Sequence, residues 1–175
     1  MKSDKILIDN RGNGFEKAVQ ESGKVARYNG LGEKGALYLQ ICTEEILSLA
    51  RSVTGEMMAS FWLENEGNQY SLHLSTKTVM NKEKRASLLS AATSRKNEAA
   101  RTFLGRIRNA FEEAMTADVN REGIPDEVLY DLPSHPIEET EWDGLERSIL
   151  KKVSDQVKIS IRGGEVEMTV LKSFN

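Results

Sequence analysis

The sequence predicts an α/β (α+β) fold, a two-layer sandwich in which helices cover one face of a mixed or antiparallel sheet. Residues 57–76 and 156–171 each alternate apolar and polar side chains on both sides of a turn, which is typical of a β-hairpin. Residues 14–29, 36–53 and 95–116 place apolar side chains at helical spacing along one stripe. Each hairpin therefore has one apolar face that needs cover, and the amphipathic helices can supply it.

Length and composition favour one folded domain spanning residues 1–175. A chain of 175 residues can bury a substantial core, and its net charge of −3 (24 basic against 27 acidic residues) gives no global attraction to nucleic acid. The single cysteine, Cys42, excludes an intrachain disulfide framework and fits a reducing compartment. No apolar stretch approaches the roughly 20 residues of a membrane span. We therefore expect a cytoplasmic protein that binds neither a membrane nor nucleic acid.

The first part of the chain predicts a short strand followed by two helices. Residues 5–9 are typical of a strand, and residues 15–28 are typical of a helix that ends at the left-handed stop Asn29-Gly30. After a short loop, residues 36–53 predict a second helix. The residues of its apolar stripe are Leu39, Cys42, Ile46, Leu49, Ala50 and Val53.

The remainder predicts the two hairpins and the helices between them. The first hairpin consists of a strand over residues 58–64, a turn, and an alternating strand that contains Tyr70, Leu72 and Leu74. A helical region is expected from about residue 82, and a short amphipathic helix is expected just before the second hairpin. In that second hairpin Gly163-Gly164 supplies a two-residue turn.

Charge is distributed unevenly along the chain. Residues 81–109 hold eight basic side chains against two acidic ones, whereas residues 112–146 hold twelve acids, all three prolines and Arg121 as their one basic residue. The acidic, proline-containing part at about 118–141 predicts an insertion without long regular structure. The basic stretch has two interpretations: a solvated helix face, or a surface for an acidic partner. For the second interpretation the candidate partner-binding residues are Arg95, Arg101 and Arg108.

Few residues of the sequence are candidates for catalytic chemistry. His73 and His135 have no second histidine or cysteine at ligand spacing, so no metal site is expected. The glycines of Gly12-Asn13-Gly14 predict a turn into a helix, with a phosphate at the helix N-terminus as the alternative. Glu45 falls at the edge of the apolar stripe of helix 36–53. There it is either an outward-facing boundary residue or a general base whose pKa is raised by partial burial.

The order of elements resembles the histidine-kinase-like ATPase (GHKL) fold, in the compact form of bacterial anti-sigma-factor serine kinases. Residues 31–55 and 57–78 carry the resemblance. In that family the second helix bears a Glu-x-x-x-Asn motif, whose glutamate activates a water or hydroxyl and whose asparagine holds magnesium. Glu45 occupies the glutamate position, and Leu49 stands where the asparagine belongs. The family's Asp-x-Gly-x-Gly motif, whose aspartate binds adenine, is replaced by Thr76 and Thr78.

The resemblance therefore implies a regulatory protein with a degenerate ATP site, which acts by binding a protein partner. A sigma factor or an anti-anti-sigma-like regulator would be such a partner, no cofactor is expected, and a homodimer is a possible assembly. The alternative is an active ATP-dependent serine/threonine kinase that uses magnesium, Glu45 as the base, and Thr76 and Thr78 as nucleotide contacts. A magnesium-dependent effect of ATP on thermal stability separates the two hypotheses.

Overall fold

A computed structural model describes residues 1–9, 11–55, 58–100, 107, 109–110, 112 and 149–175. Its centre is an antiparallel five-stranded sheet with the strand order β1-β2-β3-β5-β4. The strands are β1 (Ile6–Ile8), β2 (Ala59–Glu66), β3 (Gln69–Lys77), β4 (Gln156–Arg162) and β5 (Glu165–Ser173). Both predicted hairpins belong to this one sheet, because β3 of the first hairpin pairs with β5 of the second.

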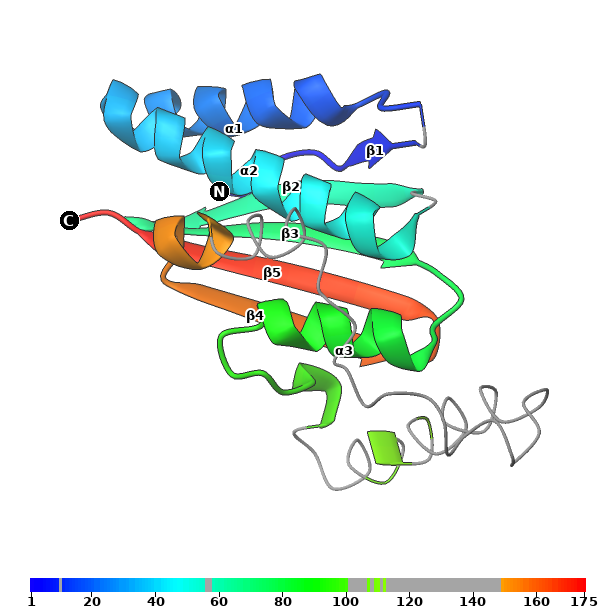
Figure 1. Ribbon diagram of the computed structural model, residues 1–175. Coiled ribbons are helices and arrows are strands. Elements are labelled where there is room, and N and C mark those ends of the chain that lie inside the picture. The colour runs from blue at the N-terminus through cyan, green and yellow to red at the C-terminus, as the bar shows by residue number, and fades with distance from the viewer. Residues whose placement is uncertain (10, 56–57, 101–106, 108, 111, 113–148) are drawn as a thin grey trace, which may run out of the picture.

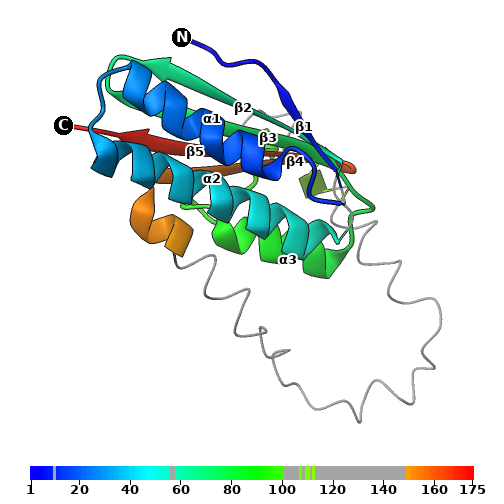
Figure 2. The same ribbon diagram turned by 90° about the horizontal axis from the view of Figure 1, so that it is seen from above.

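The described helices lie on one face of the sheet, as the sequence predicts (Figures 1 and 2). They are α1 (Phe15–Tyr28), α2 (Glu33–Thr54), α3 (Lys82–Ala91) and a short helix over residues 149–153. Helix α2 begins three residues earlier than its apolar stripe indicates, because Glu33 and its neighbours form a polar first turn. The predicted α+β sandwich is confirmed.

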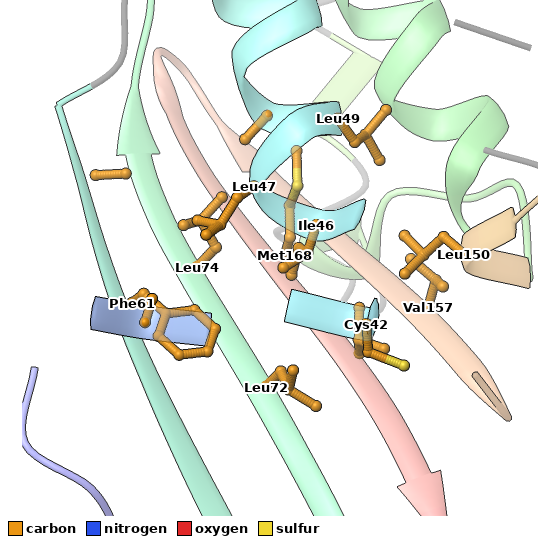
Figure 3. Close-up of a cluster of buried hydrophobic side chains, with 14 of the residues drawn as sticks. Cys42, Ile46, Leu47, Leu49, Phe61, Leu72, Leu74, Leu150, Val157 and Met168 are labelled. Carbon is orange, nitrogen blue, oxygen red and sulfur yellow. The ribbon is translucent and has the colours of Figure 1, made fainter. Parts of the chain in front are cut away.

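The interface between α2 and the sheet is the centre of the core, and buried residues of α1 and α3 belong to the same cluster. Leu72 and Leu74 of β3, Phe61 of β2 and Met168 of β5 lie beneath Cys42, Ile46 and Leu47 of α2 (Figure 3). Leu49 belongs to the same cluster and lies on the side of α2 that faces α3. All the labelled side chains in this cluster are buried. Because successive strand residues point to opposite faces, the residues between them, such as His73, lie on the face without helices.

The predicted helix over residues 95–116 is wrong at its beginning. Helix α3 ends at Ala91, Arg95 has a left-handed φ of 54°, and a single 3₁₀ turn spans Glu98–Ala100. Of the later residues, 107, 109–110 and 112 are helical and the others lie outside the described residues. The predicted insertion at 118–141 also lies outside them.

Tertiary hydrogen bonds explain why the helix does not begin there. The Thr93 amide donates to the Val157 carbonyl oxygen (2.9 Å), and the Thr93 hydroxyl accepts from the Val157 amide (2.8 Å). Asn97 forms a parallel bridge with Ile159. The segment 93–97 therefore covers the outer edge of β4, where unpaired backbone groups would otherwise remain.

The turn before α1 contains Gly12 and Gly14, and the requirement for glycine is stricter at Gly14. Gly12 and Gly14 both have a left-handed φ, of 82° and 86°. A Cβ atom at Gly14 would clash with the Leu7 carbonyl oxygen of β1, whereas a Cβ atom at Gly12 would meet nothing within 4 Å. Gly14 therefore allows the N-terminus of α1 to lie directly against β1.

We predict that Gly14→Ala lowers the free energy of unfolding much more than Gly12→Ala. Both substitutions cost about 1 kcal/mol for the left-handed backbone, but only the first adds a steric clash with fixed backbone, which should bring its cost to about 3 kcal/mol or more. Urea unfolding measures both, with Gly12→Ala as the matched control. Equal losses in the two variants would show that α1 does not lie this close to β1.

Candidate functional site

Helix α2 positions the two residues on which the family resemblance depends. Glu45 is half-buried at the edge of the helix, which matches a boundary position. Leu49, one turn later, is only 1% exposed and belongs to the core cluster. A leucine side chain offers no oxygen to magnesium, which requires oxygen ligands.

Cys42 lies one turn before Glu45 and is fully buried. Burial raises the pKa of its thiol to about 12, and the negative charges of Asp155 and Glu45 act in the same direction, against the opposing charge of Lys172. Because the thiolate is the nucleophilic form, Cys42 is a core residue and not a reactive thiol at neutral pH.

The hydroxyl groups of Thr76 and Thr78 have structural hydrogen-bond partners. Thr76 is 3% exposed, and its hydroxyl donates to the Met58 carbonyl oxygen (3.1 Å), across the β2–β3 pair. The Thr78 hydroxyl accepts from the Lys84 ammonium (3.2 Å), and its amide donates to the Gly164 carbonyl oxygen (2.9 Å). The Thr76 bond ties β3 to β2, and the Thr78 bonds tie the end of β3 to α3 and to the β4–β5 turn.

A hollow of about 720 Å³ opens beside the end of β3. Its lining residues are Gly55, Lys77, Thr78, Val79, Lys84, Gly164 and Glu165. An ion pair of 3.1 Å between Lys77 and Glu165 lies at this hollow. Glu45 does not line the hollow: ten residues separate it from Gly55, which corresponds to about 15 Å along a helix. Of the predicted site residues that the structure describes, the hollow contains Thr78 alone.

Of the three arginines predicted to bind a partner, the structure describes Arg95. Arg95 is exposed in the turn after α3, and Arg101 and Arg108 lie outside the described residues. Arg85, which belongs to the same basic stretch, is not on a solvated face: it is 4% exposed. The signal for this was its spacing, since Arg85, Leu88 and Ala92 fall on one helical stripe.

Sequence reasoning missed the polar network that Arg85 enters. The Asn97 side chain bonds both backbone groups of Ile161, accepting from its amide (2.8 Å) and donating to its carbonyl oxygen (2.9 Å). Asn97 and Arg85 both donate to the Asn109 side-chain oxygen. Glu112 accepts from the Gly163 amide (2.9 Å) and lies 3.9 Å from Arg85. The network joins α3 and the helical residues 109 and 112 to the β4–β5 hairpin.

The Asp9 carboxylate organises the loop before α1. The Asp9 side chain accepts from the amides of Arg11 (2.9 Å) and Asn13 (3.0 Å) and from the Asn13 side chain (2.7 Å). The hydrogen bond from the Asn13 side chain is the largest effect that lowers the pKa of Asp9. The glycine-containing segment forms the turn into a helix that the sequence predicts, and the structure adds that the Asp9 carboxylate stabilises it.

The described residues contain no group of three or more His, Cys, Asp or Glu side chains arranged to hold a metal ion. Among the helices of the described ranges, none combines the length and apolarity needed to cross a membrane.

Comparison with known proteins supports the fold. No protein-family model matches the sequence, and a search of curated proteins finds no match. Among solved structures, the chain is similar to one chain of "The crystal structure of SiaB-SiaC complex from Pseudomonas aeruginosa". The TM-score is 0.50 with 10% sequence identity, over 99% of this chain and 89% of that chain. At this identity the similarity concerns the fold, which is thus related to that of a chain found in a complex of two proteins.

We predict that Asn97→Ala lowers the free energy of unfolding by about 1–3 kcal/mol, because it leaves the buried amide and carbonyl groups of Ile161 without their partner. The exposed turn residue Asn68 provides the control, and Asn68→Ala should change the same quantity by less than about 0.5 kcal/mol. Chemical denaturation measures both variants. A loss at Asn97 no larger than the control would show that the network does not hold the β4 edge.

Proposed function

We propose that this protein is a regulator that acts by binding a protein partner, with a nucleotide site that is degenerate relative to anti-sigma-factor serine kinases. The observation that carries the proposal is the burial of Leu49, which is 1% exposed and belongs to the core cluster. An asparagine there would leave an amide among leucine and isoleucine side chains, at a cost of about 1–3 kcal/mol unless it found partners. The surroundings of position 49 thus favour leucine, and the leucine side chain has no oxygen that could hold magnesium.

Two further observations support a binding role. The hydroxyl of Thr76, at the position of the adenine-binding aspartate in the family resemblance, is buried and bonded to the β2 side of the sheet. The chain of similar fold occurs in the SiaB-SiaC complex, an assembly of two proteins. By analogy, the partner we propose is a sigma factor or an anti-anti-sigma-like regulator. The candidate contact residues are Arg95, which is exposed, and Arg101 and Arg108, which lie outside the described residues.

A second candidate function is an active ATP-dependent kinase, and the hollow favours it. Its volume of about 720 Å³ falls in the range of small-molecule sites, and Lys77 and Lys84 could neutralise phosphates. In this hypothesis Glu45 would serve as base, and Thr76 and Thr78 would contact the nucleotide. Glu45 would then have to act on a substrate outside the hollow, since it does not line it.

We predict that ATP with magnesium neither raises the thermal midpoint of unfolding nor supports phosphoryl transfer, because position 49 has no metal ligand. Thermal unfolding with and without ATP and magnesium, together with transfer of labelled γ-phosphate to protein, tests this. Glu45→Ala should change the free energy of unfolding by about 0–1 kcal/mol, as for a boundary residue. Phosphoryl transfer by the unmodified protein that Glu45→Ala abolishes would establish the kinase instead.

We also predict that Arg95→Glu weakens binding to the protein partner at least tenfold, since reversal of a charge at an interface turns attraction into repulsion. The partner is identified by cross-linking in the source cells, and the dissociation constant is then measured with the two purified proteins. Lys17→Glu, an equal charge change at an exposed position of α1, is the control and should leave the constant unchanged. Equal effects of both variants would place the partner elsewhere.

A further inference from the structure

The sheet face without helices carries one tightly packed polar cluster. Trp62 of β2 and His73 of β3 are direct cross-strand neighbours, and their rings stack with centroids 4.9 Å apart and planes 4° from parallel. Trp62 is 9% exposed and the His73 side chain 16%, although no helix of the described residues covers this face. Both rings are therefore largely shielded from water by their neighbours.

The cluster binds the first residues of the chain. Residues 1–5, the N-terminal segment, run beside β2 (Figure 2), and the Ser3 amide donates to the Leu63 carbonyl oxygen (2.8 Å). The Lys2 ammonium lies 2.8 Å from a Glu64 carboxylate oxygen and 5.5 Å from the centre of the Trp62 ring. The Lys5 ammonium lies 4.6 Å from the same ring. Glu64 and Trp62 thus hold this segment by charge and by cation–π contact.

His73 occupies the other side of the same carboxylate. Its Nδ1 atom is 3.2 Å from the Thr169 hydroxyl. Its Nε2 atom is buried, makes no hydrogen bond within the described residues, and lies 3.8 Å from the second oxygen of Glu64. The first oxygen of Glu64 accepts from the Trp62 indole (3.1 Å) and pairs with Lys2. A proton on Nε2 would therefore point at the carboxylate that holds Lys2.

We infer that Trp62, His73 and Glu64 form a proton-sensitive latch, which holds the N-terminal segment against β2 when His73 is neutral and releases it when His73 is protonated. Protonated His73 attracts Glu64 and places a second positive charge beside Lys2. Lys2 then shares the Glu64 carboxylate with the His73 imidazolium, and the positive charge of the imidazolium repels Lys2. No helix takes part, so the latch is independent of the proposed partner-binding function.

The charges around His73 set the direction of the effect. Burial lowers the pKa of His73 from its ordinary 6.5; Glu64 and Glu167 oppose this and Lys2 adds to it. Lys158 of β4 lies in the same cross-strand row beyond Thr169, and Lys5 lies over the indole. Lys2 leaves with the N-terminal segment, and because its charge lowers the pKa of His73, released molecules bind more protons than latched ones. The latch is therefore complete above about pH 6.5 and weakens as the pH falls below it.

The coupling is reciprocal, which gives a sharp test. If Lys2 opposes protonation of His73, removal of its charge must make protonation easier. In a Trp142→Phe background, Trp62 is the one tryptophan. Its fluorescence reports the protonation of His73, because a stacked imidazolium quenches the indole. The expected transition has a midpoint below pH 6.5, Lys2→Gln moves it upward, and Lys5→Gln leaves it in place. Lys2 and Lys5 are exposed, so neither substitution threatens the fold.

Hydrogen exchange reads out the latch itself. The protection factors of the Ser3 and Asn65 amides, which bond to Leu63 and Met1 across the segment, should fall about three- to tenfold between pH 7.5 and pH 5. They should stay constant in His73→Gln. A Trp62 transition that Lys2→Gln does not move, or protection that falls equally in the unmodified protein and in His73→Gln, overturns the latch. Should His73→Gln fail to fold, the Lys2→Gln and Lys5→Gln midpoints decide the question.

Discussion

The contact of the α2 stripe with the sheet is the constraint on which the other features depend. Each leucine or isoleucine fully buried there contributes about 1.5–3 kcal/mol relative to exposure, and the stripe supplies Leu39, Ile46 and Leu49. This packing fixes the rotation of α2, and rotation decides which side chains face outward. Glu45 lies at the boundary and Cys42 inside because one residue corresponds to 100° of helix. Position 49 therefore holds a core leucine, which offers no oxygen to a metal ion.

The two edges of the sheet are protected by different means. The β1 edge is short and is met by the α1 N-terminus, which Gly14 permits to approach the Leu7 carbonyl group. The β4 edge is covered by residues 93–97, whose hydrogen bonds to Val157 and Ile161 replace those of a neighbouring strand. The exposed turn that results carries Arg95. The surface proposed for a partner is therefore a by-product of the way in which the sheet edge is closed.

The two faces of the sheet also differ in what holds them together. The contacts between α2 and the sheet are mainly apolar packing, which has no directional requirement. Residues in these contacts could therefore be exchanged for others of similar volume. The open side depends on the stacked Trp62–His73 pair and on the Glu64 carboxylate, which joins it to Lys2. Interactions of this kind respond to protons and salt, whereas the apolar core does not. The proposed latch belongs to this open face.

The sequence by itself determined the class of fold, both hairpins, α1, α2, the burial of Leu49 and the boundary position of Glu45. Each of these follows from local periodicity, since a repeat of two or 3.6 residues states which face of an element is apolar. The tertiary structure decided the features that local periodicity does not predict. These are the end of the helix at Ala91, the burial of Arg85, and the Trp62–His73 stack. Asn97 shows the reason. Its partner Ile161 is 64 residues away, and hydrogen bonds at that distance, unlike apolar stripes, leave no repeating pattern in the sequence.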